Sequence, residues 1–288
     1  MAILLDHSAR VIIQGITGRI GKVFSARMAR HYATFCGGVR PGGGGTIDGK
    51  PIFPSVAEAV DKVGANTSVV VVPGPGVKAA ALEAIEAGIK LIWIYTDGVP
   101  VHDAMFFINY AILKGVRIIG PNAAGIVSPG KASASELNED QLGLKPGSIG
   151  IISKSGSLCY EVVDMLRRDD YGFSTVVCIG GDVVCGTTFS DLLPLFAEDA
   201  ETEAVIMLGE IGGSAEVDGA RLIPSLGKPL IGYVAGWHAP RGKKMGHAAA
   251  IISREEDTAA AKSALMERHG AHVAASLEEI GALVRTLV

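Results

Sequence analysis

The chain has 288 residues and a formal net charge of −4 at pH 7, so it carries no basic field that would attract nucleic acid. Hydrophobic residues make up 48% of the sequence, aromatic residues only 6%, and 38 residues are glycine, which is typical of α/β enzymes with many tight strand-to-helix turns. Its apolar runs are short compared with the roughly 20 residues of a membrane span. We therefore expect an α/β protein that binds neither nucleic acid nor membranes.

Strands and helices alternate in the first part of the chain. Strands are expected at 11–15, 36–40, 68–72, 91–94 and 116–119. Helical patterns lie between them at 22–32, 56–60, 77–87 and 103–114. Ser55 suits the N-cap of the second helix, with Glu58 three residues later as in a capping box. This alternation predicts parallel strands with crossover helices, and hence a doubly wound, Rossmann-like domain over residues 1–125.

A second α/β series follows a break in the pattern. The polar, glycine-rich segment 126–147 is expected to link two domains. After it, strands are expected at 148–153, 175–180, 204–209, 229–234 and 271–274. Helices are expected at 157–168, 188–196, 258–269 and 277–287. Residues 148–288 are therefore predicted to form a flavodoxin-like domain.

The N-terminus and the cysteines indicate the compartment. Asp6 and Arg10 precede a strand that begins at once, which leaves no room for a signal peptide. The four cysteines lack CxxC spacing and lie in apolar segments: Cys36, Cys159, Cys178 and Cys185. We expect reduced thiols in a cytoplasmic protein, with neither a disulfide framework nor a metal site.

A glycine turn follows the first strand. Gly15, Gly18 and Gly21 lie between strand and helix, where free N–H groups and the helix dipole face a phosphate. Arg40 stands where a nicotinamide dinucleotide site would place an acid, so the turn suits NADP, the 3′-phosphate of CoA, or a purely structural role. Residues 44–51 nearly match a P-loop, but Pro51 replaces the Ser or Thr. A partner must therefore bind any nucleoside triphosphate.

Three motifs in the second half carry chemistry. Ser153-Lys-Ser-Gly-Ser at a helix start can cap the helix or form an anion cup. Glu210 ends a strand, and His247 follows the cations Arg241, Lys243 and Lys244. Glu210 can accept one ring N–H and leave the other nitrogen of His247 as a nucleophile. The alternatives are an exposed loop acid and an ordinary loop histidine.

The order of the motifs resembles a known family. They are Gln14-Gly-Ile-Thr-Gly, Gly37-Gly-Val-Arg-Pro-Gly, Thr96-Asp-Gly-Val-Pro, Gly120-Pro-Asn, Ser153-Lys-Ser-Gly-Ser, Ile179-Gly-Gly-Asp, Gly209-Glu-Ile-Gly-Gly and Met245-Gly-His-Ala. With them the chain resembles, nearly from end to end, the α subunit of succinyl-CoA synthetase and its relatives, including malate–CoA ligase and the citryl-CoA-forming branch. The resemblance implies a Rossmann-like CoA-binding domain followed by a flavodoxin-like ligase domain that carries a phosphohistidine.

The resemblance also implies a reaction and its residues. ATP or GTP, bound with Mg²⁺ by an ATP-grasp β subunit, would phosphorylate His247, which Glu210 orients. A small carboxylate would then take the phosphoryl group, and CoA would displace phosphate from the acyl phosphate. CoA would be held by Thr17, Gly18, Arg19, Ile20, Arg40, Thr96, Asp97 and Gly98. The phosphate would be held by Ser155, Gly156 and Ser157, and Tyr160 would contact the substrate.

Several positions depart from the family pattern. Position 43 is glycine where the family usually has a lysine that meets CoA, and the sequence leaves open whether Arg40 supplies that charge or CoA binds more weakly. The other departures are Asp97 for Glu, Lys154 for Arg, Ala123-Ala124 for Cys-Pro, the segment 132–140 without a Pro-Gly-His-Ile stretch, and Trp237-His238 for smaller residues. They cluster around the ligase domain and its approach, and so we expect a succinate-like acid or, in place of succinate itself, a substituted or differently charged carboxylate.

Two other functions use part of the sequence. An NADP-dependent oxidoreductase would use the glycine turn and leave His247 and Glu210 without a role. A non-catalytic CoA-binding protein would bind CoA and form no acyl-CoA. The sequence leaves open which acid is used, whether ATP or GTP is the nucleotide, and whether the assembly is αβ or α2β2.

Overall fold

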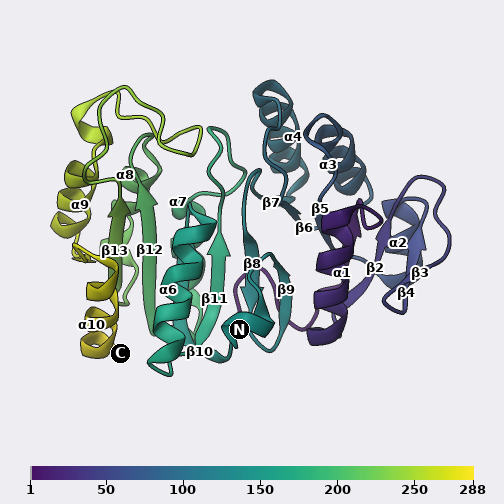
Figure 1. The fold of residues 1–288 in the computed structure, drawn as a ribbon, viewed down its shortest axis with the longest axis horizontal. Helices are drawn as coiled ribbons and strands as arrows, with labels where there is room; N and C mark the ends of the chain where they lie inside the picture. The colour runs from purple at the N-terminus through teal and green to yellow at the C-terminus, as the bar shows by residue number, and fades with distance from the viewer. Residues whose placement is uncertain (1) are drawn as a thin grey trace.

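The computed structural model describes residues 2–288 and contains two seven-stranded sheets side by side (Figure 1). The first sheet has the order β3-β4-β2-β1-β5-β6-β7. Its strands are β1 (Val11–Gln14), β2 (Phe35–Val39), β3 (Thr46–Ile47), β4 (Lys50–Phe53), β5 (Thr67–Val70), β6 (Leu91–Ile94) and β7 (Arg117–Ile119). All pairs are parallel except β3 with β4. The six parallel strands thus run in the doubly wound order of a dinucleotide-binding fold, as predicted.

The second sheet has the order β14-β13-β12-β10-β11-β8-β9. Its strands are β8 (Gly125–Ser128), β9 (Ala132–Ser135), β10 (Pro146–Ser153), β11 (Phe173–Cys178), β12 (Ala204–Glu210), β13 (Leu230–Ala235) and β14 (His272–Val273). Strands β10 to β14 are parallel, and β11 lies outside β10. This order is that of the flavodoxin-like fold expected from the sequence.

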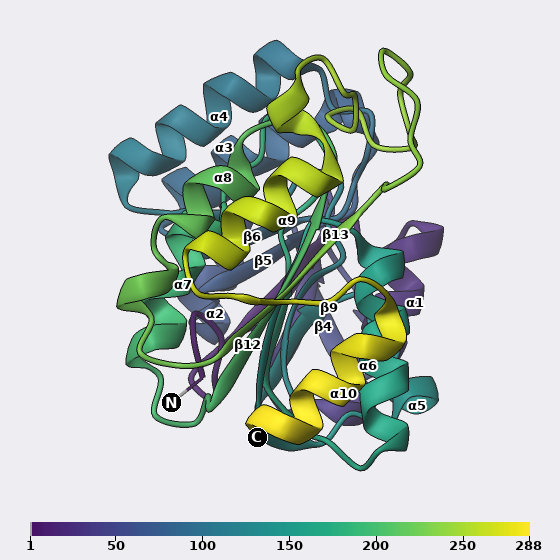
Figure 2. The ribbon, with the colours of Figure 1, turned by 90° about the vertical axis from the view of Figure 1, so that its left-hand side faces the viewer.

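Helices cover both sheets. The first half contributes α1 (Arg19–His31), α2 (Val56–Val63), the 3₁₀ turn η1 (Gly74–Gly76), α3 (Val77–Glu86) and α4 (Val101–Lys114). The second half contributes α5 (Glu139–Leu142), α6 (Gly156–Arg168), α7 (Phe189–Glu198), α8 (Ala215–Ala220), η2 (Ile223–Ser225), η3 (Glu255–Asp257), α9 (Ala259–Arg268) and α10 (Leu277–Leu287). In Figure 2, α6 and α10 lie on one face of the second sheet, and α7, α8 and α9 lie on the other. Among residues 2–288, no helix has the length and apolar character needed to cross a membrane.

The segment expected to be a linker belongs to the second sheet. Strands β8 and β9 form an antiparallel hairpin, and β8 pairs with β11. Alternation in this segment is weak because its strands are short and rich in Ala, Ser and Gly, yet all eight strand residues are buried. The prediction of a linker over 126–147 is therefore wrong, because the second sheet begins at Gly125.

One hydrophobic core joins the two halves. The same buried cluster contains Ile13 and Trp93 from the first sheet and Ile126 and Ile152 from the second. The indole N–H of Trp93 donates to the carbonyl of Ala123 at 2.8 Å. Because this apolar surface is shared, the carboxyl ends of both sheets are held in a fixed relation, which is where sites form in such folds.

Candidate functional site

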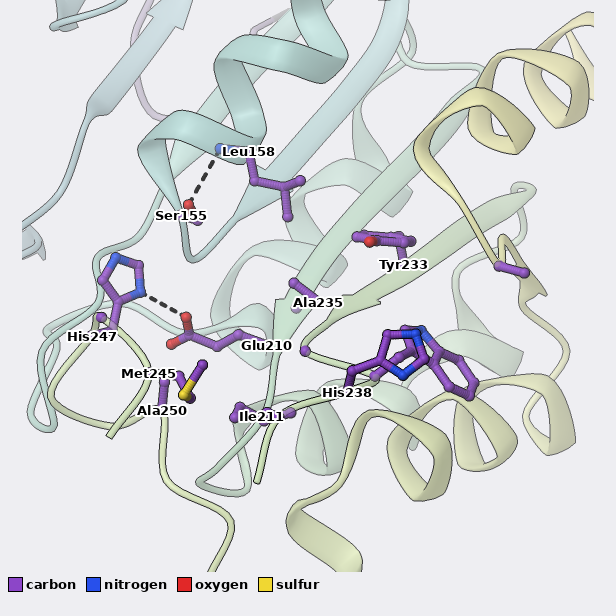
Figure 3. Close-up of a pocket in the computed structure, with 16 residues that line it drawn as sticks. Ser155, Leu158, Glu210, Ile211, Tyr233, Ala235, His238, Met245, His247 and Ala250 are labelled. Atoms are coloured by element: carbon purple, nitrogen blue, oxygen red, sulfur yellow. Dashed lines mark hydrogen bonds and ion pairs between the residues drawn. The ribbon is translucent and has the colours of Figure 1, made fainter. Parts of the chain in front are cut away.

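The ends of β10 and β12 and the segment between β13 and α9 bring the predicted site residues together. Glu210 is the last residue of β12 and Ser153 the last of β10, and the two strands are hydrogen-bonded neighbours. His247 comes from the long segment after β13. Figure 3 shows its ring beside Glu210 and below the first turn of α6.

His247 and Glu210 are directly hydrogen bonded. The distance from His247 Nδ1 to Glu210 Oε2 is 2.6 Å. An ionised carboxylate only accepts hydrogen bonds, so Nδ1 carries the proton and donates it, which leaves Nε2 with a free lone pair. The His247 side chain is 27% exposed and that of Glu210 only 10%. The imidazole is thus oriented by a largely buried acid while remaining reachable.

The interaction between His247 and Glu210 shifts the pKa of both residues. The hydrogen bond that His247 donates to Glu210, together with the negative charge of Glu210, raises the pKa of His247 above its ordinary value, although burial acts in the opposite direction. Burial raises the pKa of Glu210, but the hydrogen bond to His247 and the charge of Lys154 outweigh it, and the net pKa is lowered. Glu210 is therefore ionised at neutral pH, as the orienting role requires.

Two glycines make room for the ring. A Cβ on Gly181 would lie 2.4 Å from His247 Cγ, so any side chain there would collide with the imidazole. Gly246 has φ +83°, a left-handed conformation that favours glycine. The turn is closed on itself, since Met245 N donates to Ala250 O at 3.0 Å. The main chain at Gly181 and the carboxylate of Glu210 therefore hold the imidazole in place.

A buried charge network supports Glu210. Lys154 Nζ lies 3.3 Å from Glu210 Oε1 and 3.4 Å from Glu216 Oε1. Lys262 is 1% exposed. Its Nζ donates to Glu216 Oε2 at 2.5 Å and to the Glu210 carbonyl at 2.8 Å. Burial lowers the pKa of Lys154, but Glu216 and Glu210 outweigh it and raise the pKa. Sequence reasoning missed Glu216 and Lys262, because single charges on short helices look like solvent-facing residues.

The start of α6 was predicted to bind phosphate, and it borders His247. The Ser155 hydroxyl accepts from Leu158 N at 3.3 Å, which is the capping role that the sequence also allowed. Gly156 and Ser157 line a cavity together with His247. Tyr160 is elsewhere: its hydroxyl donates to Gln141 Oε1 at 2.8 Å, and it lines neither cavity that contains His247.

His247 lies between two cavities. The larger, of about 930 Å³, is bordered by Tyr233, Trp237 and His238. The smaller, of about 280 Å³, is bordered by Gly156 of the second half and Asp97 of the first. The imidazole of His247 thus forms part of the lining of both cavities.

The residues predicted to hold CoA lie at the carboxyl ends of the first sheet. Helix α1 begins directly after Gly18, and no side chain caps it. A Cβ on Gly21 would lie 2.4 Å from the Gly15 carbonyl oxygen, so the turn needs glycine, and Thr17, Gly18 and Arg19 are exposed residues of this turn. Such a turn can bind a phosphate, and the partly buried Ile20 follows in the first turn of the helix.

The remaining predicted CoA residues fall into two groups. The Arg40 guanidinium donates to the Gly43 carbonyl at 2.8 Å and so is folded onto its own loop. Thr96 Oγ1 donates to the Val72 carbonyl at 2.7 Å. Asp97 and Gly98 border a third cavity, of about 340 Å³, which Gly246 also lines. The structure therefore brings Asp97 and Gly98 close to Gly246, the residue before His247. Arg40 and the residues at the start of α1 line none of these three cavities.

Comparisons with known proteins agree with this arrangement. A family described as CoA binding domain matches residues 6–98, and one described as CoA-ligase matches residues 152–272. The chain is 44% identical to succinate–CoA ligase [ADP-forming] subunit alpha 2 of Archaeoglobus fulgidus, with 100% of both chains covered. It is 43% identical to malate–CoA ligase subunit alpha of Methylorubrum extorquens, with 99% of this chain and 97% of the relative covered.

A solved structure shares the fold. The structure of ATP citrate lyase from Methanothrix soehngenii in complex with citrate and coenzyme A matches with a TM-score of 0.88 at 23% identity, over 99% of this chain and 50% of that one. The full-length identities to the ligase subunits are much higher. The chain therefore belongs to the succinyl-CoA synthetase α-subunit family, with a CoA-binding domain followed by a CoA-ligase domain, as its motifs predict.

Proposed function

We propose that this chain is the α subunit of an ADP-forming acid–CoA ligase and that His247 carries the phosphoryl group between nucleotide and acid. The observation that carries the proposal is the 2.6 Å hydrogen bond from His247 Nδ1 to Glu210, made beside the first turn of α6. That bond leaves Nε2 as the nucleophile. The α subunits of ADP-forming succinate–CoA ligases at above 40% identity support the same chemistry.

The residues suit each transfer. Nε2 attacks the terminal phosphorus of the nucleoside triphosphate, the diphosphate leaves, and Glu210 balances the positive charge that the ring gains. A carboxylate oxygen of the acid then attacks this phosphorus and frees Nε2. The thiol sulfur of CoA finally attacks the acyl carbon, the bond from that carbon to the phosphate oxygen breaks, and inorganic phosphate leaves with the proton of the thiol. The start of α6 stabilises the phosphoryl anion at His247 through its dipole and its N–H groups.

The nucleotide and Mg²⁺ are proposed to come with an ATP-grasp β subunit. The sequence has no P-loop of its own, because Pro51 occupies the position of the required hydroxyl. The two cavities that meet at His247 support the proposal, because one can admit the partner's nucleotide while the other meets the acid and CoA. A cytoplasmic location is part of the proposal, since the four cysteines of the described chain are free thiols.

The two alternatives account for less. An NADP-dependent oxidoreductase gives no role to the His247–Glu210 pair or to the buried lysines behind it. A non-catalytic CoA-binding protein has no need for an imidazole that is oriented and yet reachable. The relatives named above are ligase subunits, and neither alternative occurs among them.

Labelling tests the proposal. The α and β chains, combined and incubated with γ-labelled ATP, should give an α chain whose label is stable in base and lost in acid, as expected of a phosphohistidine. Adding CoA and a panel of carboxylates should then release the label as inorganic phosphate. Label that survives acid better than base, or that persists in His247→Ala, would contradict the proposal.

A further inference from the structure

A carboxylate with no role in the steps above borders the smaller cavity at His247. Glu136 directly follows β9. Its main chain is fixed, because its N–H donates to the Ala124 carbonyl at 2.8 Å and its carbonyl accepts from Arg27 at 2.8 Å. The side chain therefore has a defined place at the wall of the cavity.

The Glu136 carboxylate lies against the start of α6. A Cβ on Gly156 would be 3.0 Å from Glu136 Oε1. Gly156, Glu136 and His247 line the same cavity of about 280 Å³. In the proposed reaction the acid must bring one carboxylate to the phosphoryl group on His247. In so small a cavity, the other end of a short acid then lies close to Glu136.

The charge of this cavity disfavours a second carboxylate. Its lining contains the acids Asp97 and Glu136 but neither lysine nor arginine. The nearby Arg27 is occupied, since it pairs with Glu139 at 2.9 Å and donates to the Ser135 and Glu136 carbonyls. Within residues 2–288, the Glu136 carboxylate itself has neither an ion-pair nor a hydrogen-bond partner. It is an acceptor that a ligand can satisfy.

We propose that Glu136 sets the substrate class: the acid carries a hydrogen-bond donor, a hydroxyl or an ammonium, at the end away from the reacting carboxylate. This inference rests on the proposed function and goes beyond it by naming the acid. A donor pairs with Glu136, whereas a second carboxylate meets a like charge in a cavity whose lining contains neither lysine nor arginine, and like charges in contact weaken binding. Burial also raises the pKa of Glu136, although Arg27 acts against it, and so its anion is poorly solvated before a donor arrives.

A matched series of four-carbon acids tests this selection in the αβ heteromer. Butyrate, 4-hydroxybutyrate, 4-aminobutyrate and succinate differ only in the group at the far end. We expect kcat/KM for CoA-dependent ADP release to be at least about tenfold higher with the hydroxyl or ammonium acid than with succinate. The two donor acids separately show whether the hydroxyl or the cation is preferred.

The variant Glu136→Gln keeps the shape of the side chain and removes its charge. It should lower kcat/KM for the donor acids by about tenfold, raise it for succinate, and leave ATP-dependent labelling of His247 unchanged. Glu161→Gln is the matched control, because Glu161 is an exposed acid on α6. That change should leave the order of the four acids as it is.

Three results would overturn the inference. Succinate could be the best acid of the four, or none of the four could be used. Alternatively, Glu136→Gln could slow all the acids equally, which would show that Glu136 does not distinguish between them. If His247 of the unaltered heteromer takes no label from ATP, the proposed function fails and the inference fails with it. If His247 is labelled normally and Glu136→Gln does not change the order of the four acids, only the inference is refuted.

Discussion

The contact between Gly181 and the imidazole predicts a large effect from one methyl group. Gly181 has no positive φ, so alanine fits its backbone, and only the ring stands in the way. A Cβ there would be 2.4 Å from His247 Cγ, whereas carbon atoms in ordinary contact are about 3.5–4.0 Å apart. In Gly181→Ala the ring must therefore retreat by roughly 1 Å.

That shift is enough to break the orienting hydrogen bond. The Nδ1–Oε2 distance is 2.6 Å, and moving the ring away by about 1 Å takes it past the usual hydrogen-bonding range. A misplacement of this size can reduce a rate by about 100-fold. The His247 side chain is 27% exposed and can move toward solvent, and so we expect the free energy of unfolding to fall by no more than about 1 kcal/mol.

A single-turnover assay of His247 phosphorylation by ATP in the heteromer measures the effect. The rate in Gly181→Ala should drop by about 100-fold. Gly281→Ala is the control, because a Cβ at this glycine in α10 would have no atom closer than 3.7 Å. That variant should phosphorylate normally. If Gly181→Ala keeps a rate within about twofold of the unaltered protein, the ring does not depend on this contact and the argument is refuted.

Three other substitutions test the site. Glu210→Gln should slow phosphorylation and move its rise with pH to lower pH, because Glu210 raises the pKa of His247 and Nε2 must be neutral to react; a pH profile checks this. Because Glu210 raises the pKa of His247, the pair stabilises the fold below the ordinary histidine pKa, and this stabilisation is lost as the pH rises through the raised pKa. In urea unfolding, Glu210→Gln should therefore lose more free energy of unfolding at pH 6 than at pH 9. Lys262→Met should lower the free energy of urea unfolding by about 3 kcal/mol, because it removes the nearer of the two lysines that pair with the buried Glu216 and leaves only Lys154, at 3.4 Å, and a second change, Glu216→Gln, should restore part of it. Ser155→Ala should cost about 1 kcal/mol in the same assay, through loss of the α6 cap.

Much of the site could be predicted because its residues follow strands. Glu210 ends β12 and the Ser153 motif ends β10, and the carboxyl ends of neighbouring parallel strands meet at one edge of a sheet. The pairing of His247 with Glu210 was expected on this basis and is present at 2.6 Å. The parallel, doubly wound sheet of the first half was likewise predicted from the alternation of strands and helices.

Other features depend on packing that local sequence does not contain. Glu216 and Lys262 lie on α8 and α9, where isolated charges usually face solvent, and they become partners only because α8 packs against α9, which itself packs on β13. The β8–β9 hairpin was missed because its strands are short and rich in small residues. Tyr160 was assigned to the substrate by resemblance alone, and in the fold its hydroxyl bonds to Gln141 at the end of α5.

Gly43 shows how a departure from the family pattern can be explained by geometry. Its φ is +55°, and a Cβ would lie 2.7 Å from the backbone nitrogen of Pro54. A lysine at this position therefore needs a different path for the whole loop, because proline nitrogen in the main chain cannot move aside as a flexible side chain can. The Gly43 carbonyl instead accepts two hydrogen bonds from the Arg40 guanidinium, at 3.1 and 2.8 Å. The missing lysine and the position of Arg40 are thus two consequences of one loop conformation, and exchanging Gly43 alone for lysine would strain the loop rather than add a usable charge.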